Sequence, residues 1–161
     1  YKVINTILDD TPFTIADTIV WKKSSALPNN TSKNKLTRIC EFVYVFVRKS
    51  ELKTFNTNKQ VKSISERGQS YYENMFNLIE ARNNDGANKL NKATFSSELV
   101  LKLLDMYYTK GVVYDPFMGT VSTGVACEML DIKWLGSEIS EAQCEYAKGR
   151  IEEVKNGSSS N

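Results

Sequence analysis

The chain has 161 residues, of which 41% are hydrophobic, and its formal net charge is +2. This length accommodates one compact domain with a buried core, and no apolar stretch approaches the roughly 20 residues that a membrane helix needs. The sequence contains no histidine, which excludes Ser-His and Cys-His nucleophile pairs and removes the commonest metal ligand. We therefore expect a protein without a membrane segment or a metal site.

The cysteines Cys40, Cys127 and Cys144 are widely spaced, and no two of them have the separation of a zinc or redox motif. Disulfides are typical of oxidising compartments, and this pattern offers no disulfide framework. We therefore expect an intracellular protein.

Two stretches rich in β-branched and aromatic residues, residues 13–23 and 38–49, predict a pair of antiparallel strands. The polar connection between them, residues 24–37, is longer than a plain hairpin needs, and loops of this length are often functional. It lies in a basic block, residues 22–62, where ten Lys or Arg and two acids give a net charge of +8. Such a block indicates either a phosphate-facing surface or a solvated loop without a partner.

Residues 50–70 are polar and show little periodicity. The apolar residues of the following stretch, residues 69–81, stand at helical spacing and predict a short helix. A second helix is expected next, with Ser96 or Ser97 as its N-cap and Glu98 in its first turn.

The order of elements is regular from there on. The sequence predicts a strand at 112–114, a turn at 115–120, a helix to about residue 130, a strand at 133–137 and a helix from Ser140. Two strands separated by one helix form a βαβ unit, which implies parallel pairing in a doubly wound sheet.

The turn after the first of these strands is the expected ligand site. In open α/β sheets, ligands bind beyond the carboxyl ends of the strands, where the amides of the following helix face the site. Gly119 would permit a close backbone approach, and Glu138 can accept both ribose hydroxyls of an adenosine cofactor. The glycine alone is a weak signal, because a purely structural turn would explain it equally well.

The combined pattern is more specific. The run Asp115-Pro116-Phe117-Met118-Gly119-Thr120, followed by Gly136-Ser137-Glu138-Ile139-Ser140 and then by Tyr146 and Arg150, resembles the S-adenosylmethionine-binding end of the β-class DNA amino-methyltransferases of restriction-modification systems and related phage or virus enzymes. The early strands and the run Lys92-Ala93-Thr94-Phe95-Ser96 resemble further parts of that family, in the same order. The resemblance covers nearly the whole chain.

The resemblance implies an α/β fold with a Rossmann-like methyltransferase sheet, mostly parallel, with an antiparallel strand pair at one edge and the upstream catalytic portion missing. Residues 1–155 would form a single methyltransferase-type domain, and residues 156–161 a flexible tail. Within the domain, residues 1–49 would be the late strand pair with its basic loop. Residues 50–90 would be a short target-recognition-like segment, and residues 91–155 the cofactor-binding βαβ part.

The resemblance also implies a function and its residues. It predicts a site-specific DNA methyltransferase that moves a methyl group from S-adenosylmethionine to the exocyclic amine of adenine, in the cytoplasm of a bacterium or of a virus- or phage-infected cell. The cofactor-binding residues that it implies are Thr94, Phe95, Ser96, Asp115, Pro116, Phe117, Gly119, Thr120, Thr123, Glu138 and Ser140. In the basic block, the residues that we expect at DNA phosphates are Lys22, Lys23, Lys33, Lys35 and Arg38.

The sequence departs from the family's pattern at two points. Val121 stands where the family has glycine, and if that position requires a positive φ, valine is strained and crowds the cofactor. Val121→Gly would then bind the cofactor more tightly. The catalytic Asp/Asn/Ser-Pro-Pro-Tyr/Phe motif is absent, because Pro12, Pro28 and Pro116 are not adjacent. We therefore expect no catalytic residue in this chain and no activity of the chain alone. The catalytic motif is expected upstream of Tyr1 or on a second chain.

Three alternatives stay open. The target could be the amino group of cytosine, because the residue that discriminates the two bases belongs to the absent motif. The chain could be an inactive nucleic-acid-binding remnant in which Val121 has abolished cofactor binding. Glu138 after a βαβ turn would also suit a nicotinamide-dependent oxidoreductase. Methylation of a cytosine ring carbon is disfavoured, because no cysteine follows a proline.

Overall fold

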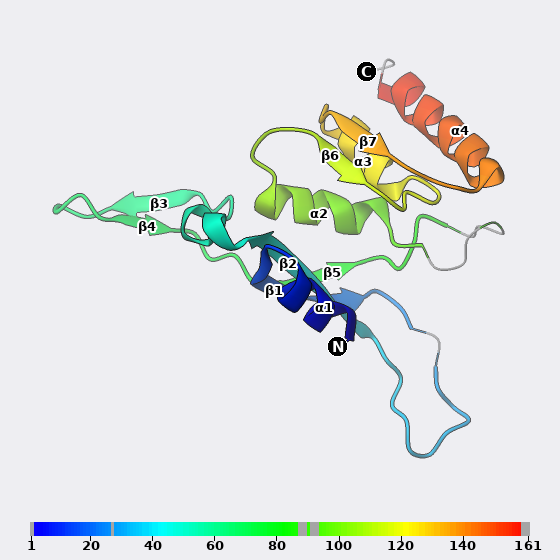
Figure 1. The fold of residues 1–161 in the computed structure, drawn as a ribbon, viewed down its shortest axis with the longest axis horizontal. Helices are drawn as coiled ribbons and strands as arrows, with labels where there is room; N and C mark the ends of the chain where they lie inside the picture. Colours follow the sequence, from blue (N-terminus) through cyan, green and yellow to red (C-terminus); the bar gives the residue numbers. More distant parts are fainter. Residues whose placement is uncertain (1, 27, 87–89, 91–93, 159–161) are drawn as a thin grey trace. The chain divides into compact units, whose positions relative to one another are not determined.

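The computed structural model describes residues 2–26, 28–86, 90 and 94–158. Two compact units divide the chain, residues 1–80 and residues 81–161, and Figure 1 labels the elements of both. Lys92 and Ala93, which belong to the run compared with the family, lie outside the described residues.

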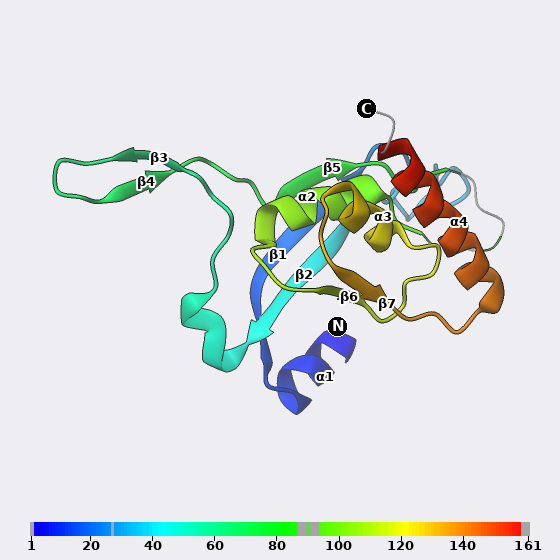
Figure 2. The same cartoon turned by 90° about the horizontal axis from the view of Figure 1, so that it is seen from above.

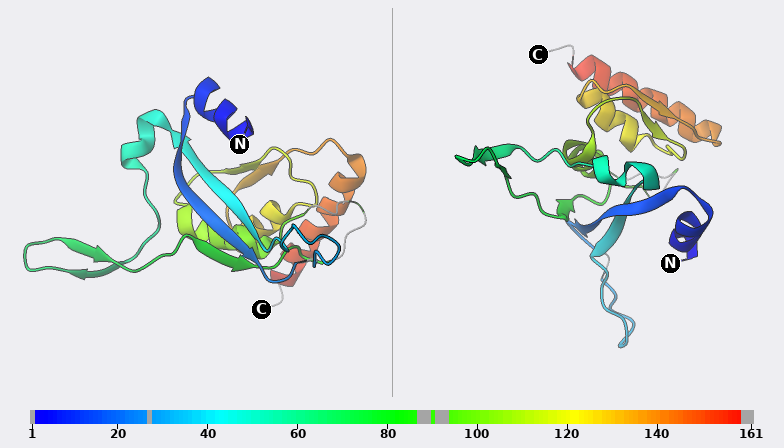
Figure 3. Two further views of the ribbon diagram at one scale, coloured as in Figure 1. Left: turned by 90° about the horizontal axis from the view of Figure 1, so that it is seen from below. Right: turned by 60° about the vertical axis from the view of Figure 1, so that its left-hand side comes forward.

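The first unit contains two small sheets. Its elements are α1 (Lys2–Asp10), β1 (Phe13–Lys23), β2 (Cys40–Arg48), the 3-10 helix η1 (Lys49–Thr54), β3 (Val61–Ile64), β4 (Ser70–Tyr72) and β5 (Leu78–Ala81). One sheet has the strand order β2-β1-β5, and β3 and β4 pair separately. Within this unit, the β3–β4 hairpin and the loop between β1 and β2 both extend away from the three-stranded sheet (Figure 3).

The expected antiparallel strand pair is confirmed. β1 and β2 pair from Phe13 opposite Arg48 to Lys22 opposite Cys40, with one irregularity between Ile15 and Asp17. Successive side chains of a strand point to opposite faces. Ile19 and Trp21 are accordingly buried on one face, whereas Phe42 of β2 stands opposite Val20 on the other face and is 64% exposed.

The prediction of a helix over residues 69–81 is wrong, because this stretch forms β4 and β5. β4 pairs with β3 in an antiparallel ladder. In β5 burial alternates, with Ile79 and Ala81 buried and their neighbours exposed, which is the period of a strand. The apolar residues at helical spacing therefore belong to two strands, and Phe76 between them is exposed. Neither α1 nor β3 has a counterpart among the expected elements.

The second unit contains the expected βαβ arrangement. Its elements are α2 (Ser97–Tyr107), β6 (Val113–Asp115), α3 (Ser122–Met129), β7 (Trp134–Gly136) and α4 (Glu141–Ser158). β6 and β7 pair in parallel, which confirms the predicted crossover, and Figure 2 shows them side by side. α4 continues through Ser158 and so includes three residues of the stretch expected to be a flexible tail.

The N-terminus of α2 is capped as the sequence indicates. Ser96 is the N-cap residue, and its hydroxyl accepts the backbone N–H of Leu99 at 3.2 Å. The same hydroxyl donates to the carbonyl of Arg82 at 2.7 Å. This side chain therefore satisfies one free amide of the helix and also fixes the segment that follows β5.

One hydrophobic cluster of the second unit lies between α3, α4 and β7. Val121, Val125 and Ala147 are buried in it, and Met118, Trp134, Ile151 and Val154 pack around them. No helix among the described residues is long and apolar enough to cross a membrane. Over the same described ranges, no group of three or more His, Cys, Asp or Glu could hold a metal ion.

Glu98 should make the stability of the second unit depend on acid pH. The backbone N–H of Arg82, followed by the ammonium of Lys102, lowers the pKa of Glu98 from its usual value of 4.5. A carboxylate with a lowered folded-state pKa stabilises the fold above its unfolded pKa, and this contribution is lost as the pH falls through the folded value. Glu98→Gln should therefore lose less stability than the parent chain on acidification.

Thermal unfolding followed by circular dichroism between about pH 7 and about pH 3 measures this difference. Glu153→Gln on α4 is the control, because Glu153 is an exposed carboxylate of the same unit. If Glu98→Gln and Glu153→Gln follow the same pH dependence, the Arg82–Glu98 contact contributes nothing to acid stability.

Candidate functional site

The carboxyl ends of the two parallel strands lie next to each other. β6 ends at Asp115, which stands opposite Gly136 at the end of β7. The backbone N–H of Ser137 donates to the carbonyl of Asp115 at 2.9 Å. The side chains that follow the two strands, Glu138 among them, therefore meet at one edge of the sheet, which is where ligands bind in open α/β folds.

The Asp115 carboxylate closes the turn after β6. One of its oxygens accepts the backbone N–H of Phe117 at 3.0 Å, and the other accepts the hydroxyl of Thr123 at 2.6 Å. The side chain that begins the turn thus holds the first turn of α3. Asp115 and Thr123, both predicted to bind the cofactor, are brought together, and their polar groups serve the turn itself.

Glu138 is bonded to the same turn. Its Oε2 accepts the backbone N–H of Gly119 at 3.0 Å, and its Oε1 accepts the backbone N–H of Ser140 at 2.8 Å. Two backbone donors fix the orientation of this half-buried carboxylate. Because each carboxylate oxygen has two lone pairs, each keeps one for a further donor. The carboxylate can therefore accept two adjacent hydroxyl groups, such as those of a ribose.

Two large apolar side chains close to Glu138 and the turn in sequence are almost fully exposed. Phe117 is 87% exposed and Ile139 is 101% exposed. Exposed apolar groups beside a polar anchor are typical of small-molecule sites, which combine apolar walls with a few oriented polar groups. Sequence reasoning included Phe117 and missed Ile139, whose signal is its position directly after the acidic residue at the end of β7.

The other predicted cofactor-binding residues differ in their access to solvent. Four are exposed or half-buried, namely Thr94, Phe95, Pro116 and Ser140. Ser96 is fully buried, and Thr120 is 3% exposed. Ser96 and Thr120 therefore offer no accessible side chain to a ligand, and their roles are to cap α2 and to form the turn.

Val121 adopts a left-handed backbone conformation, with φ of 65° and ψ of 31°. The condition on which the expected strain depends, a positive φ at this position, is therefore met. The conformation costs a residue with a Cβ atom about 1–2 kcal/mol. The chain enters α3 here, since the backbone N–H of Val125 donates to the Val121 carbonyl at 2.9 Å.

The expectation that the Val121 side chain crowds the cofactor is wrong, because that side chain lies in the core. It is fully buried with Val125 and Ala147. Gly124 leaves room for it, since a Cβ atom at position 124 would lie 2.6 Å from Val121 Cγ2 and 2.7 Å from the Trp134 ring. Burial of a valine side chain stabilises a fold by about 1.5–3 kcal/mol, which offsets the backbone strain.

An ion pair that sequence reasoning missed joins several parts of the second unit. Arg150 Nη2 on α4 lies 2.6 Å from Asp85 Oδ2, and both side chains are less than one-fifth exposed. Asp85 also accepts the backbone N–H of Ser97 at 2.9 Å and its hydroxyl at 3.0 Å. Asp85 and Arg150 are 65 residues apart, so no local pattern could have linked them.

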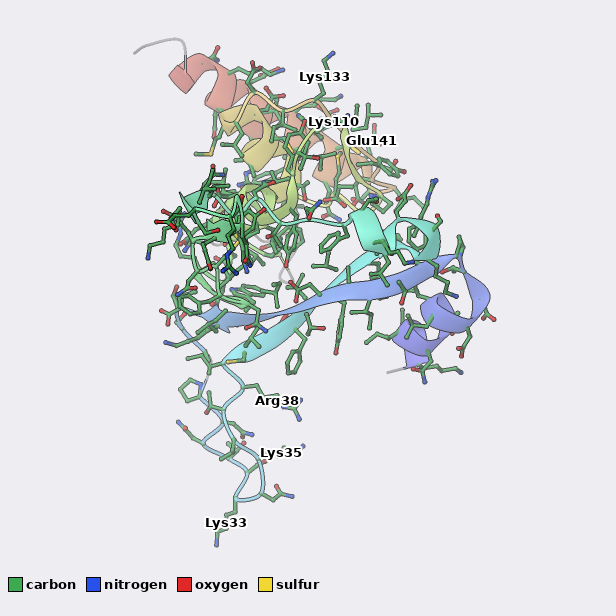
Figure 4. All side chains as sticks on the ribbon, turned by 90° about the vertical axis from the view of Figure 1, so that its left-hand side faces the viewer. Lys33, Lys35, Arg38, Lys110, Lys133 and Glu141 are labelled. Atoms are coloured by element: carbon green, nitrogen blue, oxygen red, sulfur yellow. The ribbon has the colours of Figure 1, made fainter. Side chains whose placement is uncertain are left out.

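The five basic residues expected at DNA phosphates fall into two groups. Lys22 pairs with Glu80 at 2.5 Å, and Lys23 pairs with Glu41. The other three, Lys33, Lys35 and Arg38, are exposed on the loop between β1 and β2. Figure 4 shows them along this loop, with Lys33 at its tip. Within the described ranges these three form no ion pair, so their charges are available to an anionic partner.

The sequence matches a known protein family. A family model for N6/N4 methyltransferases, described as DNA methylase, matches residues 1–149. The chain is 24% identical to the orphan methyltransferase M.BamHII of Bacillus amyloliquefaciens, over 86% of this chain and 63% of that protein. It is 28% identical to the type II methyltransferase M.Cfr9I of Citrobacter freundii, over 83% of this chain and 43% of that protein. The chain thus spans about half the length of these curated relatives.

Solved structures show the same fold. The cytosine-N4-specific PvuII DNA methyltransferase matches with a TM-score of 0.69 at 17% identity, over 96% of this chain and 60% of that one. The complex of M1.HpyAVI with S-adenosylmethionine matches with a TM-score of 0.63 at 25% identity, over 94% of this chain and 70% of that one. The expected fold class, an α/β methyltransferase fold with parallel and antiparallel strands, is confirmed.

Val121→Gly should destabilise the protein by roughly 1–2 kcal/mol, because the packing that is lost exceeds the strain that is relieved. Urea unfolding measures the change, and Val112→Gly is the control. Val112 is an exposed valine outside the left-handed region. A Val121→Gly protein that is as stable as the parent or more stable would show that strain outweighs packing at this position.

Proposed function

The chain belongs to the family of N6/N4 DNA methylases, and on this basis we propose that it binds S-adenosylmethionine at the ends of β6 and β7, as the cofactor-binding part of a DNA methyltransferase. The observation that carries the proposal is the Glu138 carboxylate, which two backbone amides orient at the ligand-binding edge of a parallel strand pair. S-adenosylmethionine is the cofactor of this family, and M1.HpyAVI is solved in complex with it.

The residues present fit this cofactor. Glu138 keeps two lone pairs for the two ribose hydroxyls, while the exposed side chains of Ile139 and Phe117 offer apolar surface for the adenine. Asp115 is engaged in the turn and keeps it closed. The role of these side chains is to bind and orient, which is a large part of catalysis in a reaction that depends on alignment.

When bound, the cofactor supplies a methyl group on a positively charged sulfur. The acceptor is an exocyclic amine of a DNA base, which has to be presented by a side chain and a backbone acceptor of the family's Pro-Pro motif. That motif is absent from this sequence. We therefore propose that a further segment or a second chain supplies it, and that the chain alone does not transfer methyl groups.

We propose adenine as the target and keep the amino group of cytosine as the alternative. The modified nucleoside in the product DNA distinguishes the two bases.

The loop between β1 and β2 is proposed as a DNA contact. Lys33, Lys35 and Arg38 lie on a projecting, exposed segment (Figure 4). Basic side chains of this kind contact phosphates and position a protein on a duplex without reading its sequence. Lys22 and Lys23 are less available, because both are already paired with carboxylates.

Glu138→Gln should weaken S-adenosylmethionine binding by about tenfold or more, because the amide loses the charge and places an N–H where a hydroxyl has to donate. Isothermal titration measures the affinity. Glu141→Gln, at the exposed first residue of α4 (Figure 4), is the control and should bind like the parent. Titration with nicotinamide cofactors is the second arm, and binding of these in place of S-adenosylmethionine would overturn the proposed function.

Neutralising Lys33, Lys35 and Arg38 together to glutamine should weaken DNA binding and reduce its salt dependence. Each lost phosphate contact lowers the slope of log affinity against log salt by about 0.9, so the slope should fall by up to roughly 2.7. Fluorescence anisotropy over a range of salt concentrations measures this. The control neutralises the exposed Lys110, Lys133 and Lys148 of the second unit. Equal slopes for the two triple variants would reject the loop as the DNA contact.

A further inference from the structure

We propose that Arg150 is a positioning residue for the cofactor turn: its guanidinium holds the carbonyl of Thr120 and so maintains the strained backbone that presents Glu138 to the cofactor. The proposal rests on the proposed function of this site. It deepens that function by assigning a role to two side chains, Arg150 and Asp85, that lie outside the turn.

The geometry places one planar group between two anchors. Arg150 Nη1 donates to the Thr120 carbonyl at 2.7 Å, and Nη2 donates to Asp85 Oδ2 at 2.6 Å. The guanidinium is rigid and presents its donors in a fixed fork. Fixing one nitrogen on Asp85 therefore also fixes the position of the other nitrogen relative to the turn.

A hydrogen bond to the Thr120 carbonyl restrains the backbone at the strained position. It belongs to the peptide that leads into Val121, whose φ is 65°. The other side of the same peptide is bonded as well, since the backbone N–H of Val121 donates to the Met118 carbonyl at 2.7 Å. Rotation of this peptide plane is the direct way for valine to leave the left-handed region, and it would break both hydrogen bonds. Arg150 therefore opposes the rearrangement that would relieve the backbone strain at Val121.

The turn also orients the Glu138 carboxylate, which is the proposed acceptor of the ribose hydroxyls. Gly119, the residue before Thr120, donates its backbone N–H to Glu138 Oε2 at 3.0 Å. A rotated Thr120–Val121 peptide would displace Gly119 and remove one of the two amides that fix the carboxylate. Arg150 therefore acts on cofactor binding through the turn and Glu138, without itself touching the ligand.

Asp85 positions Arg150 and ties it to two helix starts. Its carboxylate accepts the N–H and the hydroxyl of Ser97 at the start of α2, and the hydroxyl of Ser122 at the start of α3 lies 3.4 Å from it. An arginine and an aspartate of low exposure are stable only as a pair with their hydrogen bonds satisfied. Loss of either partner leaves the other charge unpaired.

The two hydrogen bonds that Arg150 donates to Asp85 and Thr120 act as a clamp on the turn. Glycine would occupy the left-handed region at almost no cost, so a chain with glycine at position 121 would need this clamp less. Valine makes the clamp more important, because its left-handed backbone is strained even though its side chain is well packed. The clamp and the departure at Val121 should therefore be energetically coupled.

Arg150→Lys is the main test variant, because it keeps the positive charge beside Asp85 while a single ammonium cannot reproduce the fork. Lys155→Met is the matched control: Lys155 also lies on α4 and pairs with α3, at Glu128, away from the turn. Arg150→Lys should weaken S-adenosylmethionine binding by about tenfold, as expected for one charge-assisted hydrogen bond, and Lys155→Met should not. The loss should be smaller when Arg150→Lys is made in a Val121→Gly background.

Amide hydrogen exchange without cofactor gives an independent readout. In Arg150→Lys the Val121 amide should exchange at least about tenfold faster, while the Val113 amide, which is bonded to Lys133 in the strand pair, should be unchanged. Uniform acceleration of both amides would show a merely structural role and overturn the proposal. Asp85→Asn should reproduce the local effect, and it serves as the second variant if Arg150→Lys does not fold.

The outcomes separate this proposal from the proposed function. If the parent chain binds S-adenosylmethionine and Arg150→Lys binds it equally well, the positioning role is wrong and the function stands. If the parent chain binds no S-adenosylmethionine but the Val121 amide alone exchanges faster in Arg150→Lys, Arg150 holds the turn as proposed and the proposed function is wrong.

Discussion

The hydrogen bond from the Gly119 amide to the Glu138 carboxylate, 3.0 Å long, is the interaction on which the site depends. It joins the turn after β6 to the residue after β7, and it can form only because the two strands run parallel with Asp115 opposite Gly136. The other contacts of the turn preserve this bond. Asp115 closes the turn on Phe117 and Thr123, and the Arg150 guanidinium holds the carbonyl that follows Gly119.

Val121 illustrates how a local cost is offset by packing. The backbone at this position is left-handed, as it would be for glycine, and the side chain points into the core against Val125 and Ala147. Gly124 is the complementary residue, since any side chain there would collide with Val121 and Trp134. The departure from the family's pattern therefore places its side chain in the core of the second unit.

The sequence predicted the parts of the fold that follow from local patterns. The strand pair of residues 13–23 and 38–49 and the βαβ crossover with Glu138 at its end rest on composition and period, and both are present. The helix over residues 69–81 failed because apolar residues of two short strands imitate a helical stripe. The Asp85–Arg150 pair could not be predicted, since it joins residues far apart in sequence and depends on the tertiary fold.

We propose that the turn and Glu138 together bind the adenosine part of S-adenosylmethionine. A crystal structure of the protein with S-adenosylmethionine would show where the ribose lies. We expect both ribose hydroxyls within hydrogen-bond distance of the Glu138 carboxylate, the adenine against Ile139, and Val121 still buried with a positive φ. A cofactor bound elsewhere, or a Glu138 carboxylate that makes no contact with the ribose, would contradict it.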